Sequence, residues 1–155
     1  MVSDPTLAVT RLVPTPEPTS ARAAAVMRGN RRRDTSPELR LRKLLHAQGL
    51  RFRVDLVILT RSRRVRPDIV FPRQRVVVFV DGCFWHGCPE HLVRSRSNRD
   101  YWDAKLARNL SRDHADNEAL NRDGWTVVRV WGHETADSAA ERVFEKLSVQ
   151  VGTGK

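Results

Sequence analysis

Two apolar runs separated by a polar turn make up the stretch Arg66-Pro67-Asp68-Ile69-Val70-Phe71-Pro72-Arg73-Gln74-Arg75-Val76-Val77-Val78-Phe79-Val80-Asp81. This pattern predicts a β-hairpin with strands at Asp68–Phe71 and Arg75–Val80. The second run is apolar on both faces, which places it in the centre of a sheet. Asp68 begins the first strand and Asp81 follows the second, so the hairpin should bring two carboxylates together.

Helical and strand patterns alternate on both sides of this hairpin. The sequence Asp34-Thr35-Ser36-Pro37 is typical of a helix start, and Gly49 of a helix end. The expected elements are a helix at Pro37–Gln48, a strand at Phe52–Leu56, a basic loop at Thr60–Arg66, a long helix at Tyr101–Arg122 ending at Gly124, a buried strand at Trp125–Trp131 and an amphipathic helix at Thr135–Leu147. This alternation indicates an α/β domain with a mixed sheet.

Positive charge is concentrated in one part of the chain. The 155 residues carry a formal net charge of +10. Residues 28–66 hold thirteen Arg or Lys and three acids, so they contribute 13 − 3 = +10 by themselves. Most of these cations are arginines, which suit bidentate contacts to phosphate or guanine. We therefore expect an anionic polymer as partner, with a generally basic surface as the alternative. A membrane partner is not expected, because no apolar run approaches the roughly 18 residues of a membrane span.

Residues 1–26 differ in character from the rest of the chain. They hold four of the eight prolines, with Ser and Thr between them and no periodicity. This composition predicts a disordered leader. A single domain is expected at residues 27–150.

The two acids of the hairpin favour a metal site. Carboxylates that converge at a sheet edge repel each other unless a cation joins them. Oxygen ligands in a partly hydrated site suit Mg²⁺, and a substrate phosphate would supply further ligands. Asp68 and Asp81 therefore predict a magnesium site, although a Pro-Asp pair is also common in turns.

Two further acids continue apolar stripes of the predicted helices. The stripe of the first helix is expected to point inward at Leu41, Leu44, Leu45 and Gln48, and Glu38 extends it by one turn. Glu38 is either half of a capping box with Thr35 or an auxiliary of the catalytic site. The stripe of the long helix consists of Trp102, Leu106 and Leu110, continued by Asp113, Asn117 and Leu120. Asp113 is either paired with an arginine in the interior or part of the site, because an unpaired buried acid is costly.

The cluster Asp81-Gly82-Cys83-Phe84-Trp85-His86-Gly87-Cys88-Pro89-Glu90-His91 combines metal ligands with aromatic residues. Cys83, Cys88 and His91 offer three ligands for a tetrahedral zinc, and His133 is the candidate for the fourth. A competing assignment uses His86 in place of His91, and a third possibility is that the thiols bind no metal. Phe84 and Trp85 lie on a loop that zinc would pin. Exposed aromatics on such a loop suit wedging between base pairs, whereas core packing is the simpler alternative for either residue alone.

At these positions the sequence resembles the very-short-patch-repair endonucleases. The shared motifs run in register from about Met27 to Glu134: Met27-Arg28, Arg33-Asp34-Thr35-x-x-Glu38, Gly49-Leu50-x-Phe52-Arg53, Arg66-Pro67-Asp68, Phe79-x-x-Gly82-Cys83-Phe84-Trp85-His86, Asn109-x-x-Arg112-Asp113 and Gly124-Trp125-x-Val127-x-x-Val130-Trp131. The resemblance implies a PD-(D/E)xK-nuclease-like fold with one structural zinc. It also implies a bacterial, cytoplasmic, monomeric enzyme that nicks DNA 5′ of the thymine in T:G mismatches, which arise by deamination of 5-methylcytosine.

The resemblance assigns a role to each matching residue. Asp68 would be the central ligand of the catalytic Mg²⁺, and His86 would activate the attacking water. Glu38 and Asp113 would support the site. Residues expected to contact double-stranded DNA, by wedging or by charge, are Met27, Phe84, Trp85, Trp102, Arg28, Arg31, Arg32 and Arg33.

Three features depart from the pattern of that family. Val80-Asp81 replaces the frequent Thr-His, so Val80 can offer only its carbonyl to the metal while Asp81 adds a carboxylate. The loop between the cysteines is short, and His133 stands where a cysteine is frequent. The alternatives are a related metal-dependent nuclease of other DNA specificity and a non-catalytic mismatch-binding protein. The intact set Asp68, Asp81 and His86 argues against the latter.

Overall fold

The central sheet is mixed, as expected. The computed structural model describes residues 15–18, 20–22, 24–25, 33–83, 86–91 and 96–152. Strands β3 (Ile69–Phe71), β4 (Val76–Asp81) and β5 (Thr126–Trp131) lie in the order β3-β4-β5. β3 pairs antiparallel with β4, which confirms the hairpin, and β4 pairs parallel with β5. The central place predicted for β4 is confirmed, and five of its six residues are buried.

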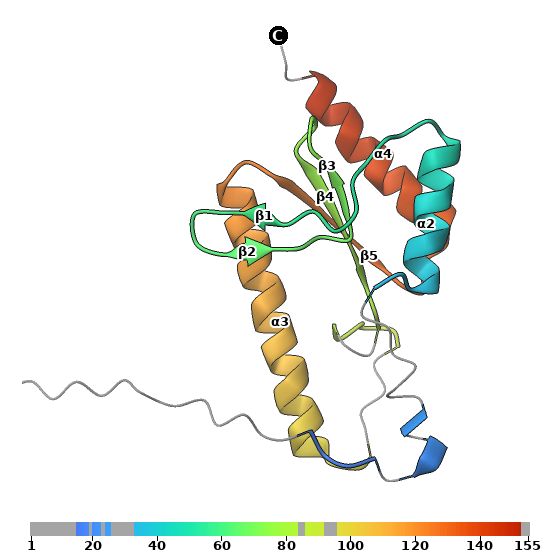
Figure 1. The fold of residues 1–155 in the computed structure, drawn as a ribbon, viewed down its shortest axis with the longest axis vertical. Helices are drawn as coiled ribbons and strands as arrows, with labels where there is room; N and C mark the ends of the chain where they lie inside the picture. Colours follow the sequence, from blue (N-terminus) through green and yellow to red (C-terminus); the bar gives the residue numbers. More distant parts are fainter. Residues whose placement is uncertain are drawn as a thin grey trace, which may run out of the picture.

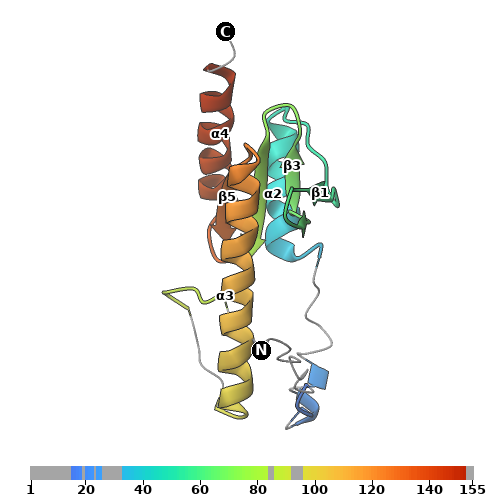
Figure 2. The same cartoon turned by 90° about the vertical axis from the view of Figure 1, so that its left-hand side faces the viewer.

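Helices cover both faces of this sheet, as Figures 1 and 2 show. Helices α2 (Ser36–Ala47) and α4 (Ala136–Gly152) pack together on one face, where their apolar side chains form one core cluster with alternate residues of the strands. Helix α3 (Arg99–Arg122) lies on the other face and contributes Leu120 to a second cluster. The three predicted helices are thus confirmed. Among the described residues, no helix is both long and apolar enough to cross a membrane.

The ends of the helices follow from local chemistry. Pro37 stands in the first turn of α2, where its missing N–H costs no hydrogen bond. Gly49 ends that helix with a φ of +84°, and Gly124 follows α3 with a φ of +81°. Both glycines adopt the left-handed conformation that a side chain would disfavour.

The expected strand at Phe52–Leu56 is wrong. Only Arg53 pairs there, in an isolated bridge with Val70, and Asp55 has a φ of +58°, which breaks the extended backbone. The prediction of a loop at Thr60–Arg66 is also partly wrong, because β2 (Arg64–Val65) pairs antiparallel with β1 (Ile58–Leu59). This small hairpin shields the α3 face of the sheet through Ile58 and Val65, a role that alternation of residues alone does not reveal.

Burial along three elements also differs from the expected stripes. Gln48 is exposed, so the inward stripe of α2 ends at Leu45. Leu110 is 45% exposed, because the N-terminal half of α3 extends beyond the edge of the sheet. In β5 only Val128 and Val130 are buried. The projecting half of α3 lies beside the end of β4, where the acids of the predicted site lie.

Candidate active site and metal cluster

Three carboxylates gather where β4 ends. Asp68 precedes β3, Asp81 is the last residue of β4, and Glu38 lies in the first turn of α2. Oδ2 of Asp68 accepts a hydrogen bond of 2.7 Å from the backbone N–H of Val80, which ties the acid to the neighbouring strand. Glu38 and Asp81 are almost fully buried, at 2% and 5% exposure. The hairpin therefore brings Asp68 and Asp81 to one edge of the sheet, as the sequence predicts.

The electrostatic environment of Asp68 favours a bound cation. The pKa of Asp68 is raised to about 6, chiefly by burial and also by the negative charges of Glu38 and Asp81, while the Val80 N–H and Arg42 oppose the rise. Placing a divalent cation beside this carboxylate would relieve both the desolvation and the repulsion. The donor set, carboxylate oxygens in a half-buried position, fits Mg²⁺.

Glu38 secures the start of α2, but the capping box expected with Thr35 does not form, because the Thr35 side chain makes no cap hydrogen bond. The Glu38 carboxylate accepts hydrogen bonds from the backbone N–H of Asp34 at 2.9 Å and the hydroxyl of Thr35 at 3.0 Å, which secures the start of α2. Arg42, one turn further along, donates to Glu38 at 3.1 Å. Because Glu38 also acts electrostatically on Asp68, it links the helix start to the acidic site.

His86 lies between two acids. Its Nδ1 atom is 2.5 Å from Oδ2 of Asp113 and 3.6 Å from Oδ1 of Asp81. Although burial raises the pKa of Asp113, the hydrogen bond and charge of His86 and the charge of Arg129 outweigh that effect and hold the pKa below its usual range. Asp113 is therefore ionised and fixes one imidazole nitrogen, which leaves Nε2 as the atom able to accept a proton.

Arg129 and Arg42 are the two site residues that sequence reasoning missed. Arg129 on β5 donates to Asp81, and Arg42 on α2 donates to Glu38 and Asp34. The sequence contains a feature that could have pointed to each of these arginines. Arg129 is a charge inside an otherwise apolar strand pattern, and Arg42 stands four residues after a buried acid, the spacing of a helical ion pair.

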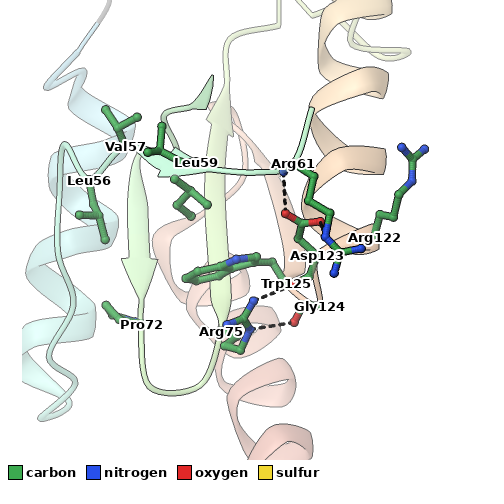
Figure 3. A pocket seen from close by; sticks show the side chains of 11 residues that line it. Leu56, Val57, Leu59, Arg61, Pro72, Arg75, Arg122, Asp123, Gly124 and Trp125 are labelled. Atoms are coloured by element: carbon green, nitrogen blue, oxygen red, sulfur yellow. Dashed lines mark hydrogen bonds and ion pairs between the residues drawn. The ribbon is translucent and has the colours of Figure 1, made fainter. Parts of the chain in front are cut away.

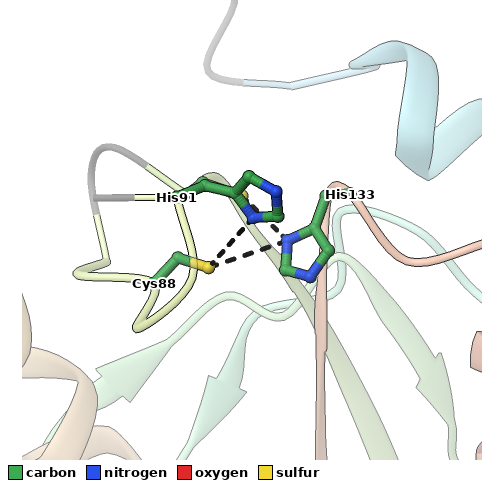
Figure 4. A group of neighbouring side chains, drawn as sticks. Cys88, His91 and His133 are labelled. Atoms are coloured by element: carbon green, nitrogen blue, oxygen red, sulfur yellow. Dashed lines mark hydrogen bonds between the residues drawn. The ribbon is translucent and has the colours of Figure 1, made fainter. Parts of the chain in front are cut away.

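The four residues predicted to bind zinc come together at the loop that follows β4. The ligand atoms of Cys83, Cys88, His91 and His133 all lie within 4.8 Å of one another. Figure 4 shows His91 and His133 facing Cys88, each with its Nδ1 at 3.7 Å from Sγ, and Sγ of Cys83 lies 3.0 Å from Nδ1 of His133. His86, the competing candidate, lies with Asp113 instead. Two sulfurs and two imidazoles in this space fit a tetrahedral zinc.

The two thiols of this cluster differ in acidity. Burial raises the pKa of the Cys83 thiol, and the neighbouring Cys88 raises it further. Burial also acts to raise the pKa of Cys88, but contacts with the His91 ring and with backbone N–H groups outweigh it and lower that pKa. Thiolate is the form that binds metal, so zinc binding would require deprotonation of these thiols.

Most of the residues predicted to contact DNA lie outside the described residues. These are Met27, Arg28, Arg31, Arg32, Phe84 and Trp85. Arg33 is described and forms ion pairs with Asp34 and Asp55. Trp102 lies in the first turn of α3, with its ring edge-on to Tyr101 and Lys105 above it at 5.2 Å.

One pocket lies away from these acids. Figure 3 shows it beside β1, the turn between β3 and β4, and the turn that precedes β5. Its volume is about 810 Å³, and Arg75 stacks over Trp125 at its wall. Arg75 precedes the first residue of β4, whereas Asp81 is the last, so the pocket and the acidic site lie at opposite ends of that strand. None of the predicted site residues lines this pocket.

Comparison with known proteins gives the family. Residues 17–91 match the model of the family described as DNA mismatch endonuclease Vsr. The chain is 44% identical over 133 residues to the type II nicking enzyme V.NaeI of Lentzea aerocolonigenes, covering 85% of this chain and 80% of the relative. It is 41% identical over 127 residues to the DNA mismatch endonuclease Vsr of Escherichia coli (strain K12), covering 77% and 79% of the two chains. The type II nicking enzyme V.XorIIP of Xanthomonas oryzae pv. oryzae is 41% identical over 116 residues, covering 74% and 82%. This chain therefore belongs to the DNA mismatch endonuclease Vsr family.

Proposed function

We propose that this protein nicks one strand of duplex DNA on the 5′ side of the thymine in a T:G mismatch. The main support for this proposal is the His86–Asp113 pair beside the carboxylates of Asp68 and Asp81. The chain also belongs to a family of mismatch endonucleases. Its relatives are named as a mismatch endonuclease and as nicking enzymes. The +10 net charge suits a polyanionic substrate.

Each polar residue of the site has a task in hydrolysis. Nε2 of His86 would take a proton from the attacking water while Asp113 holds Nδ1. The water oxygen forms a bond to phosphorus as the bond to the 3′ oxygen breaks. The departing 3′ oxygen takes up a proton from solvent water, which leaves 5′-phosphate and 3′-hydroxyl ends. Arg42 would hold Glu38 in place behind Asp68.

The proposed cofactor of this step is Mg²⁺, with Asp68 as its central ligand and the Val80 carbonyl beside it. When bound, the cation would neutralise charge on the phosphate and lower the pKa of a water. Asp81, the second predicted carboxylate ligand, could join it only by giving up its contact with Arg129.

We propose in addition that Cys83, Cys88, His91 and His133 hold one structural zinc. Its effect would be to pin the loop that carries Phe84 and Trp85, so that these aromatics are rigid enough to wedge into the duplex. The enzyme is expected to act as a monomer. Light scattering at the assay concentration, with and without DNA, measures that state.

The experiment that tests this function compares matched and mismatched duplexes of one sequence. End-labelled T:A, T:G and C:G duplexes are incubated with the protein and Mg²⁺, and the position and strand of each nick are read on a denaturing gel. Nicking of the T strand at T:G alone supports the proposal. Equal cleavage of matched DNA would support a nuclease of other specificity, and tight T:G binding without a nick would indicate a non-catalytic mismatch binder.

A further inference from the structure

The side chain of Arg129 on β5 contacts residues of both β4 and α3. Its Nη1 lies 2.9 Å from both carboxylate oxygens of Asp81, and its Nε donates to the side-chain oxygen of Asn117 at 3.0 Å. Its Nη2 lies 3.6 Å from Oδ1 of Asp113. The guanidinium also lies over the ring of Phe79, with its central carbon 4.3 Å from the ring centre. One arginine thus connects the end of β4 with the middle of α3.

The two acids that Arg129 contacts are the two that contact His86. Asp81 and Asp113 come from different elements, and each would repel the other without a cation between them. A planar guanidinium has donors in fixed directions and can serve several acceptors at once, which a lysine ammonium cannot do in the same geometry. Arg129 is 21% exposed at its side chain, so these interactions are only partly screened by solvent.

The same contacts leave Asp81 poorly suited to bind a divalent cation. Both of its oxygens already face a positive charge, and its exposure is 5%. A cation bound at Asp81 would stand next to the guanidinium and be repelled by it. Asp68 differs, because it accepts a hydrogen bond from a neutral donor, the backbone N–H of Val80.

We propose that Arg129 is a positioning residue that holds Asp81 as a charge partner and keeps it from binding the catalytic cation. Through Asp81 and Asp113, Arg129 fixes the ring of His86 in the place where it meets the attacking water. Asp68 is then the only one of the two hairpin acids that binds Mg²⁺. The catalytic part of this inference rests on the proposed nicking activity, whereas the part on cation binding does not.

The test is the double variant Asp81→Asn/Arg129→Gln, which removes a negative and a positive charge together. The local net charge is unchanged in this variant. A change in its affinity for the cation would therefore report the loss of Asp81 as a ligand and not a general electrostatic effect. Mn²⁺ alone is titrated calorimetrically into zinc-saturated protein without DNA, and kcat and KM are measured for the T:G duplex. We expect Mn²⁺ affinity within about threefold of wild type, kcat lower by about 10- to 100-fold, and KM within about threefold.

A matched control is Arg63→Gln. Arg63 forms an ion pair of 2.8 Å with Asp116 on α3, one turn after Asp113, and its side chain is 33% exposed, against 21% for Arg129. Losing the Arg63–Asp116 ion pair should lower the melting temperature, as losing the ion pair of Arg129 does. The kcat of Arg63→Gln should stay unchanged. A second variant, Arg129→Lys, keeps the positive charge but lacks the planar set of guanidinium donors. Its kcat should remain at least fivefold below wild type. This variant keeps the test decisive if the double variant melts below the assay temperature.

Several outcomes overturn the inference. A tenfold or larger loss of Mn²⁺ affinity in the double variant would make Asp81 a cation ligand. A wild-type kcat in the double variant or in Arg129→Lys would remove the positioning role. If wild-type protein nicks no duplex at all, the proposed function fails, yet the Mn²⁺ titration still decides whether Asp81 binds the cation.

Discussion

Nδ1 of His86 lies 2.5 Å from Oδ2 of Asp113, although the two residues are 27 positions apart in the chain. The contact joins the loop after β4 to the middle of α3. A carboxylate at one imidazole nitrogen holds the ring in a single orientation and keeps a proton on that nitrogen. The other nitrogen is then available for proton transfer.

The first prediction concerns this pair. Asp113→Asn should lower kcat for nicking by on the order of a hundredfold, because a neutral amide neither anchors the protonated Nδ1 nor stabilises a charged ring. KM should change little, since Asp113 contacts no DNA in this proposal. Single-turnover nicking of a T:G duplex measures the effect. Asp116→Asn is the matched control on the same helix, and an equal loss of rate in both variants would show a general effect on α3.

The second prediction follows from the raised pKa of Asp68. Protons compete with Mg²⁺ for this carboxylate, so the Mg²⁺ concentration needed for half-maximal nicking should rise about tenfold per pH unit below about pH 6. Between pH 7 and 8 this concentration should stay nearly constant. Nicking rates over a grid of pH and Mg²⁺ concentration give the result, and a flat dependence down to pH 5 would contradict the assignment.

The third prediction concerns stability without the cation. A folded-state pKa of about 6, above the usual 3.8, means that the neutral acid is favoured, so this contribution is present at pH 3.8 and below and is lost as pH rises through about 6. Asp68→Asn should therefore stabilise the Mg²⁺-free protein at pH 7, by about 1 to 3 kcal/mol, while abolishing nicking. Urea unfolding at pH 4 and pH 7 compares the variant with wild type. A destabilised variant at pH 7 would show that the charged form is stabilised by its surroundings.

The fourth prediction concerns zinc. Elemental analysis should find one zinc per chain, and Cys88→Ser should lose the metal and unfold at lower temperature, because binding of a structural zinc is coupled to folding. His91→Ala should also release zinc, whereas His86→Ala should retain it and lose only activity. If His86→Ala released zinc and His91→Ala retained it, His86 would be the zinc ligand in place of His91.

The fifth prediction concerns recognition of the mismatch. Wedging an aromatic between base pairs costs a few kcal/mol of unstacking, and a wobble pair lowers that cost. Trp85→Ala should therefore reduce nicking of the T:G duplex strongly and leave weak binding to matched DNA close to wild type. Retained zinc and a cooperative thermal transition are the required controls. A folded variant that nicks at the wild-type rate would assign the ring to core packing.

Local patterns predicted those elements whose interactions lie within a short stretch. The hairpin of β3 and β4, the helix α2 with its Pro37 start, and the length of α3 follow from apolar runs and end residues close in sequence. The expected strand at Phe52–Leu56 was wrong because alternating residues suit an extended segment as well as a paired strand. The pairing of β1 with β2 was missed because two-residue strands leave almost no periodicity.

The sequence by itself determined the chemistry present in this protein: the carboxylates, the histidine, the thiols and the charge. Only the tertiary structure decided their partners, because partners such as His86 and Asp113, or Cys88 and His133, lie on different elements and meet through packing. Arg129 shows this most clearly. In the sequence it interrupts an apolar strand, whereas in the fold the parallel pairing of β5 with β4 brings it within hydrogen-bonding distance of Asp81. A buried charge must find an opposite charge, and which one it finds is set by the fold.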